Sequence, residues 1–170
     1  MAETISHDTR KKVTMSAKKI FCDIPKCVAC RTCELACAVE HSTTKDLFLA
    51  MLDRPIPKKR TFVHAIERGV SHSMGCQHCD DAPCIEACIA QCISKDELTG
   101  KVDIDNARCV GCWMCVMACP FGIITRNLGE ANKALKCDLC PDRESPACVD
   151  ACPTDALSYK HREEFYGKKG

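Results

Sequence analysis

Residues 109–120 read CVGCWMCVMACP and set the pattern for the whole chain. The stretch has the form C-x2-C-x2-C-x3-C-P, with its cysteines at Cys109, Cys112, Cys115 and Cys119. Three other runs share its beginning, C-x2-C, and its end, C-x3-C, and differ only in the gap between them. The four runs therefore form an internal repeat in which a compact run alternates with an expanded one.

The first run, CVACRTCELAC, is compact, whereas the second, CQHCDDAPCIEAC, and the fourth, CDLCPDRESPACVDAC, are expanded. Together the four runs contain sixteen of the eighteen cysteines: Cys27, Cys30, Cys33 and Cys37; Cys76, Cys79, Cys84 and Cys88; Cys109, Cys112, Cys115 and Cys119; Cys137, Cys140, Cys148 and Cys152. The other two are Cys22 and Cys92. We interpret both as small buried residues, with a redox-sensitive or substitute-ligand role for Cys92 as the alternative.

The composition shows that side-chain packing alone does not hold this chain together. The 170 residues suffice for one domain or two small ones. Without its cysteines, the hydrophobic fraction falls from 46 % to about 35 %, which is little for a core. The sequence shows no signal segment and no membrane-spanning run, which predicts a cytoplasmic protein. In that compartment, clustered thiols indicate bound metal rather than a disulfide scaffold. The net charge of +1 gives no indication of nucleic-acid binding.

Two kinds of metal site compete for these thiols. Structural zinc takes four ligands, commonly as two C-x2-C pairs separated by a longer loop. The run C-x2-C-x2-C-x3-C-P is typical of [4Fe–4S] ferredoxins, in which the fourth cysteine binds a different cluster from the first three. The third run matches it in full, including Pro120, and the first has Ala38 in place of the proline. Sixteen ligands predict four [4Fe–4S] clusters in two cross-linked pairs, with a zinc-stabilised interaction module as a remote alternative. Spacing alone does not decide which runs pair.

The segments between the runs are short. Alternating patterns predict strands within 18–24, 101–105, 122–127 and 156–160, and a hairpin over 60–75 that turns near Arg68 and Gly69. The x3 segment of each run suits one helical turn, and KDLFLAML (45–52) predicts a short helix that ends before Pro55. Residues 1–16 and 161–170 are predicted to be flexible tails.

From about residue 18 to 160, the chain resembles the four-cluster ferredoxin subunits of formate dehydrogenases, formate hydrogenlyases and dimethyl sulfoxide reductases. Within that group, CRTCELACAVEHS, CQHCDDAPCIEAC and CVGCWMCVMACPFG look most like the iron–sulfur protein associated with nickel carbon monoxide dehydrogenase. The resemblance implies an α+β fold with two bacterial-ferredoxin-like lobes, in which small sheets and short helices surround four clusters. The outer lobe would comprise 17–57 and 129–160, and the inner lobe 58–128.

The resemblance also implies a nested set of ligands. One outer cluster would be held by Cys27, Cys30, Cys33 and Cys152, and the other by Cys137, Cys140, Cys148 and Cys37. The inner clusters would be held by Cys76, Cys79, Cys84 and Cys119, and by Cys109, Cys112, Cys115 and Cys88. No histidine is needed as a ligand, but His78 lies inside the second run and is a candidate hydrogen-bond donor to a cluster sulfur. We interpret Trp113 as packing that excludes water from a cluster.

No catalytic constellation appears in the sequence, so we expect an electron carrier without an active site. The resemblance implies that electrons come from carbon monoxide dehydrogenase and pass to a hydrogenase or a flavin-dependent NAD(P)H oxidoreductase. The protein would be peripheral to a membrane complex only through such partners. The alternative is the iron–sulfur subunit of a formate dehydrogenase, formate hydrogenlyase or related molybdenum or tungsten enzyme. The basic stretch RPIPKKR (54–60) is interpreted as a solvated loop, with docking as the alternative.

Overall fold

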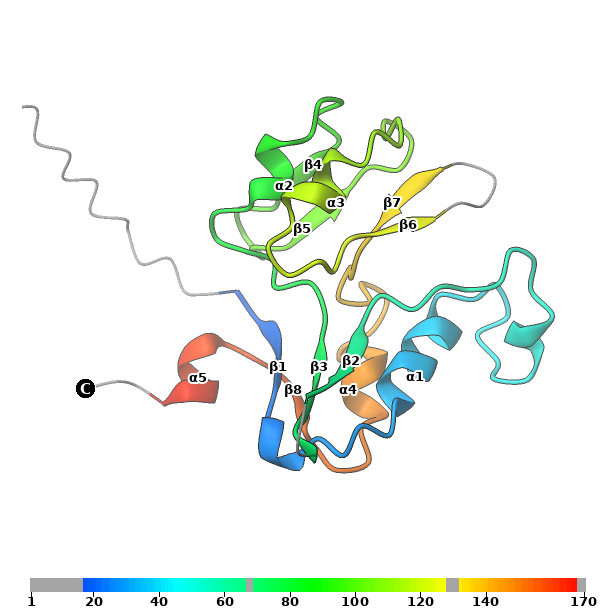
Figure 1. Cartoon of the computed structure of the whole chain (residues 1–170), viewed down its shortest axis with the longest axis vertical. Coiled ribbons are helices and arrows are strands. Elements are labelled where there is room, and N and C mark those ends of the chain that lie inside the picture. The colour runs from blue at the N-terminus through cyan, green and yellow to red at the C-terminus, as the bar shows by residue number, and fades with distance from the viewer. Residues whose placement is uncertain (1–16, 67–68, 128–131, 168–170) are drawn as a thin grey trace, which may run out of the picture.

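The fold consists of short helices and small antiparallel sheets (Figure 1). A computed structural model describes residues 17–66, 69–127 and 132–167. The strands are β1 (Lys19–Cys22), β2 (Phe62–Ala65), β3 (Ser71–Met74), β4 (Ile93–Lys95), β5 (Val102–Ile104), β6 (Thr125–Asn127), β7 (Lys133–Leu135) and β8 (Leu157–Lys160). The helices are α1 (Thr32–Glu40), α2 (Pro83–Glu86), α3 (Met114–Ala118), α4 (Ala147–Asp150) and α5 (Arg162–Tyr166), with single turns η1 (Ile24–Lys26) and η2 (Leu49–Met51).

Each described sheet is a pair of antiparallel strands. Three of the pairs join strands that are neighbours in sequence: β2 with β3, β4 with β5, and β6 with β7. The fourth, β1 with β8, joins the two ends of the described chain and places Lys19 opposite Lys160. Strands were predicted at β1, β2, β3, β5, β6 and β8, and the structure confirms them, although β6 covers only the second half of the predicted 122–127.

A short helix lies at the third cysteine of every run, as the x3 segments predict. The helix of the first run, α1, packs against that of the fourth, α4. The helix of the second run, α2, packs against that of the third, α3 (Figure 1). The fold thus brings together runs that are far apart in sequence.

The buried hydrophobic residues form two separate groups. One includes Ile93, Val102 and Ile124, and the other includes Val63 and Leu157. Buried cysteines belong to both groups. The core therefore lies around the thiols.

The β2–β3 hairpin contacts the N-terminal segments, although its sequence position groups it with 58–128. The buried Glu34 carboxylate of α1 accepts the Val63 N–H at 2.7 Å. The Ser71 hydroxyl donates to the Cys27 carbonyl at 2.7 Å. These two contacts fix the hairpin against the first cysteine run.

Several segments differ from the sequence predictions. The helix predicted over 45–52 is reduced to the single turn η2. Where a C-terminal tail was predicted, α5 packs back on the protein, with the Phe165 ring stacked on Phe21 at 4.8 Å between centroids. Strands β4 and β7 were not predicted. Residues 1–16 and the predicted turn at Arg68 lie outside the described residues. Within the described residues, no helix is both long and apolar enough to cross a membrane.

Candidate metal centre

The cysteine runs curl because several residues between the thiols adopt a left-handed backbone. In the first run Ala29 and Arg31 have φ of 55° and 61°, and the equivalent Gly111 and Trp113 of the third run have 69° and 66°. A Cβ at Gly111 would lie 2.1 Å from the Asn132 carbonyl oxygen, so only glycine fits there. Both compact runs therefore have the same local fold.

Three cavities are each lined by three cysteines of one run and the last cysteine of another. The first is lined by Cys27, Cys30, Cys33 and Cys152, the second by Cys76, Cys79, Cys84 and Cys119, and the third by Cys109, Cys112, Cys115 and Cys88. These are the groupings that the resemblance implies. That these thiols bind clusters stays a prediction.

The remaining predicted ligands also lie near one another. Burial raises the pKa of Cys148 well above the usual range, and the charges of Cys137, Cys37 and Cys140 raise it further. Burial likewise raises the pKa of Cys137 to about 12, with contributions from Cys37 and from Cys76 of the second run. Thiols of two groups therefore act electrostatically on Cys137.

The donor set fits iron–sulfur clusters. Each group offers four sulfur atoms, the number that a cubane needs. Further hydrogen bonds reach the sulfurs: the Arg60 N–H donates to Cys37 at 3.2 Å, and the Leu139 N–H donates to Cys137 at 3.4 Å. Hydrogen-bond donors of this kind stabilise a negatively charged sulfur. A bound metal ion stabilises the thiolate as well, and so offsets the free-energy cost of burying its charge.

Exposure distinguishes two of the four groups. Among the eighteen cysteines, only Cys30 and Cys112 are exposed. Exposed apolar residues adjoin both, namely Val28 in the first run and Val110 in the third. The cysteine groups that contain Cys30 and Cys112 therefore reach the surface.

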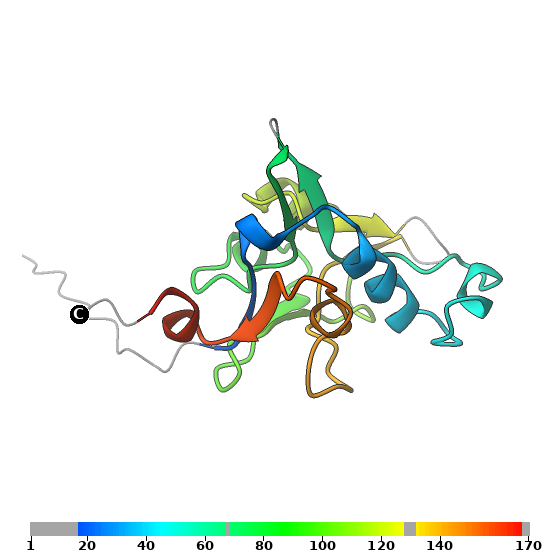
Figure 2. The ribbon, with the colours of Figure 1, turned by 90° about the horizontal axis from the view of Figure 1, so that it is seen from below.

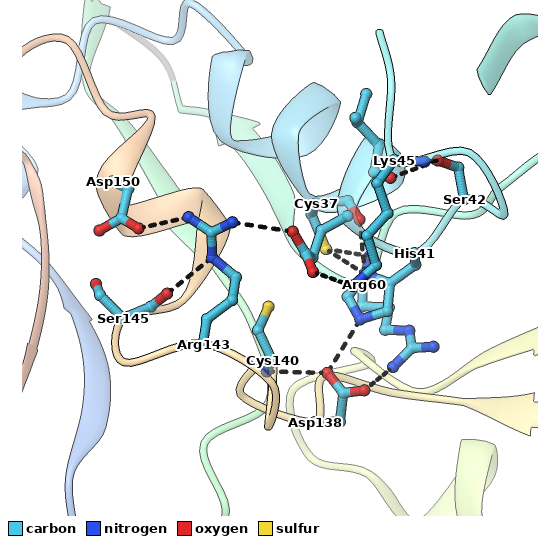
Figure 3. Close-up of polar contacts among 12 residues, drawn as sticks. Cys37, His41, Ser42, Lys45, Arg60, Asp138, Cys140, Arg143, Ser145 and Asp150 are labelled. Atoms are coloured by element: carbon cyan, nitrogen blue, oxygen red, sulfur yellow. Dashed lines mark hydrogen bonds and ion pairs between the residues drawn. The ribbon is translucent and has the colours of Figure 1, made fainter. Parts of the chain in front are cut away.

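A polar cluster that the sequence did not predict surrounds Cys37 (Figure 3). Asp138 accepts hydrogen bonds from His41 Nε2 at 3.1 Å, from the Cys140 N–H at 3.2 Å and from the Arg60 guanidinium. Its own burial raises the pKa of Asp138, but His41 and Arg60 outweigh that effect and hold the pKa well below its usual range. Burial lowers the pKa of His41, but its hydrogen bonds to Asp138 and Cys37 raise the pKa to about 9.

Lys136 is buried between β5 and the fourth run. Its ammonium donates to the Cys137 carbonyl at 3.0 Å and to the Val102 carbonyl in β5. Lys136 and Val102 are 34 residues apart in the sequence. Neither this lysine nor the cluster around Asp138 has a local sequence signal, because their partners are distant in the chain.

His78 lines the second cavity and is almost completely buried. Its Nδ1 accepts the Val102 N–H at 3.0 Å. Burial, with the charges of Lys136 and Lys101, lowers the pKa of His78 to about 3, so the ring is neutral. The proton is therefore on Nε2, which is buried and finds no hydrogen-bond partner among the described residues.

Both extra cysteines lie beside predicted ligands. The Cys92 N–H donates to the Cys88 sulfur at 3.3 Å, and the two sulfurs are 3.4 Å apart. Cys92 lines the third cavity and is buried, as predicted. Cys22 was predicted to be buried but is only half-buried, and its sulfur accepts the Ser73 N–H at 3.4 Å. The position of Cys92, four residues after Cys88, is the signal that could have indicated this contact.

Groups of buried thiols without a catalytic constellation are typical of ferredoxin-type electron carriers. Residues 70–162 match the family described as 4Fe-4S dicluster domain. The chain belongs to this family.

Relatives extend the likeness over most of the chain. The putative electron transport protein YsaA of Escherichia coli K12 is 40 % identical over 140 residues, which cover 81 % of this chain and 86 % of that protein. The electron transport protein HydN of the same organism is 39 % identical, covering 81 % and 85 %. The thiosulfate reductase electron transfer subunit PhsB of Salmonella typhi is 34 % identical, covering 84 % and 74 %. The chain is thus an iron–sulfur electron-transfer protein of oxidoreductase systems, without an active site of its own.

Proposed function

We propose that this chain passes single electrons along four [4Fe–4S] clusters held by the nested sets of cysteines. The observation that carries the proposal is that three described cavities are each lined by three cysteines of one run and the last cysteine of another, with Cys92 as an additional cysteine in the third. In this arrangement the inner and outer pairs of clusters are the centres of two lobes. The two separate buried groups of the core support that division.

The proposed order of the clusters follows from neighbouring thiols. Cys148 of the fourth run and Cys33 of the first belong to the same buried group, and the charge of Cys76 of the second run raises the pKa of Cys137. These observations favour the order first, fourth, second and third run. The exposed Cys30 and Cys112 then belong to the two terminal clusters, where electrons would enter and leave.

The chain's own residues hold and bury these clusters. When bound, the clusters supply the one-electron chemistry. The N–H groups of Arg60 and Leu139 orient the ligand sulfurs. Trp113 lines the third cavity, where it helps to exclude water.

Iron and sulfide analysis of anaerobically purified protein tests the number of clusters. We expect about sixteen irons and sixteen sulfides per chain, because each cubane contains four of each. Roughly twelve irons would contradict the set of four. Zinc in place of iron would refute electron transfer altogether.

Two classes of partner compete. One relative, PhsB, is the electron transfer subunit of a reductase. This relative favours a partner from the broader group of formate dehydrogenases, formate hydrogenlyases and related molybdenum or tungsten enzymes. Carbon monoxide dehydrogenase, with a hydrogenase or flavin-dependent NAD(P)H oxidoreductase as acceptor, is the second candidate, which rests on sequence motifs alone. Two measurements distinguish these partners. Reduction of the clusters by formate in host extract, with molybdenum or tungsten in the co-purified partner, supports the first class. Reduction by carbon monoxide, with nickel in the partner, supports the second.

Replacing His78 with phenylalanine is expected to lower the midpoint potential of one cluster. The Nε2 proton is free to donate to a sulfur of the second cavity, which stabilises the more negative, reduced cluster. Loss of a hydrogen bond worth about 1 kcal/mol corresponds to about 40 mV for one electron.

Redox titration followed by electron paramagnetic resonance measures this shift. The exposed His64 on β2 provides the matched control, His64→Phe, which should leave all potentials unchanged. Equal potentials in wild type and His78→Phe, at equal iron content, would show that His78 only supports the backbone.

A further inference from the structure

The loop that follows α1 exposes six large apolar side chains within ten residues. We call residues 46–56 the apolar loop; it contains η2 and projects from the body in two perpendicular views (Figures 1 and 2). Phe48 and Leu52 are each 72 % exposed, and the other exposed apolar residues are Leu47, Leu49, Met51 and Ile56. Isolated exposed apolar residues are ordinary, but a contiguous group marks a binding surface.

Hydrogen bonds hold the apolar loop in one shape. One carboxylate oxygen of Asp46 accepts the N–H groups of Phe48 and Leu49, both at 2.9 Å. Asp53 accepts the Thr43 N–H at 2.7 Å, which closes the base of the loop. A loop fixed before binding loses little conformational entropy when it docks.

The chain that follows the apolar loop contacts a predicted cluster ligand. After the loop, the Arg60 N–H donates to the sulfur of Cys37. The residues that directly follow the loop, Pro57 and Lys58, line an open groove together with Leu35 of α1. Arg31, which follows the exposed Cys30, lines the same groove. A protein that covers the loop and groove therefore reaches the exposed thiol of a terminal group.

Charge indicates the kind of partner. Residues 45–60 contain five basic and two acidic residues. The two acidic residues are engaged with backbone N–H groups. Lys45, Lys59 and Arg60 pair with carboxylates of this chain, whereas Arg54 and Lys58 have no carboxylate partner among the described residues. A second copy of the chain would bring these unpaired cations together, which disfavours self-association through this face.

We propose that the apolar loop inserts into an apolar pocket, rimmed by carboxylates, on the catalytic subunit of a partner oxidoreductase. This inference rests on the proposed electron-transfer function. Binding places that subunit over the groove beside α1, so that electrons pass through the terminal cluster next to Cys30. The apolar residues provide affinity, and Arg54 and Lys58 steer the approach of the acidic rim.

The test begins with a photo-crosslinking phenylalanine analogue at position 48 in the cluster-loaded chain, in its own host. The crosslinked protein is identified by mass spectrometry and purified, and its rate of electron exchange with the chain is measured. We expect the crosslink to join a catalytic redox subunit. The double variant Phe48→Ser, Leu52→Ser should then exchange electrons with that subunit at least about tenfold more slowly.

The matched control is Leu98→Ser in the loop between β4 and β5, because Leu98 is 95 % exposed. It should exchange electrons within about twofold of the wild-type rate, because it lies outside the proposed hot spot. Iron content and thermal stability should be the same in all three proteins.

Three results would overturn the docking proposal. They are a crosslink to a second copy of the chain, binding to vesicles of anionic phospholipid that the double variant loses, and an unchanged exchange rate. A chain that holds no iron would instead refute the proposed electron-transfer function, while the crosslink would still report what covers the apolar loop.

Discussion

Removing the clusters is expected to abolish the cooperative thermal unfolding of this protein. Among the described residues, twenty buried hydrophobic residues form the core, and nine of them are cysteines and five are alanines. Only six are large aliphatic residues: Val63, Ile93, Val102, Ile123, Ile124 and Leu157. Metal binding that is absent from the unfolded chain contributes its free energy directly to folding. Without it, the remaining apolar burial does not offset the conformational entropy of the chain.

Circular dichroism during heating provides the measurement, before and after anaerobic iron chelation. The holoprotein should melt in one cooperative transition, and the chelated chain should show none. Reconstitution with iron and sulfide should restore the transition, which excludes chemical damage as its cause. A sharp melt of the iron-free chain would show that packing and hydrogen bonds suffice.

The sequence predicted the elements that depend on local pattern. Each x3 segment suits one helical turn after the third cysteine of its run, so α1 to α4 could be placed from the cysteine spacing. Strands such as β5 and β8 follow from alternation of polar and apolar residues. The pairing of β1 with β8 is a distant contact that no local pattern contains.

The errors also have physical causes. KDLFLAML has the composition of a helix, and Asp46 accepts the N–H groups of Phe48 and Leu49 as a helix N-cap does. Only the turn η2 forms, because the chain folds back until Asp53 accepts the Thr43 N–H. Residues 161–170 are too polar to predict a place in the core, yet the Phe165 ring stacks on Phe21 of β1. Both outcomes depend on a partner that the sequence does not identify.

The candidate site was predictable in kind but not in its surroundings. The run around Cys109 indicates iron–sulfur chemistry by itself, whereas the pairing of runs required the family resemblance. The interaction of His41 with Asp138 spans 97 residues, and that of Arg60 spans 78. No spacing rule links residues so far apart, although their ion pairs hold together the segments around Cys37.

Replacing Asp138 with asparagine is expected to accelerate the irreversible loss of clusters by about a hundredfold near neutral pH, because breaking a largely buried ion pair costs about 3 kcal/mol. Asp138 joins three segments: the end of α1 through His41, the chain before β2 through Arg60, and the fourth run through Cys140 (Figure 3). The variant leaves two cations facing each other without their carboxylate. Loss of the brown cluster absorbance in denaturant measures the rate.

Asp142→Asn is the matched control, because Asp142 lies in the same run and is exposed. It should leave the rate within about threefold of wild type, as surface charges contribute little. A rate for Asp138→Asn equal to that of Asp142→Asn would show that the cluster around Asp138 does not stabilise the fold.

The dependence on pH gives the prediction a second signature. The pKa of His41 is raised from 6.5 to about 9, so its contribution to stability is complete below pH 6.5 and is lost as the pH rises through about 9. The pKa of Asp138 is lowered from 3.8, so its contribution is present above pH 3.8 and is lost only in acid. The difference between wild type and Asp138→Asn should therefore be full at pH 6.5 and shrink as His41 deprotonates. Because Arg60 keeps its charge, part of the difference should persist above pH 9. A difference that stays constant between pH 6.5 and 9 would show that Arg60 alone carries the interaction.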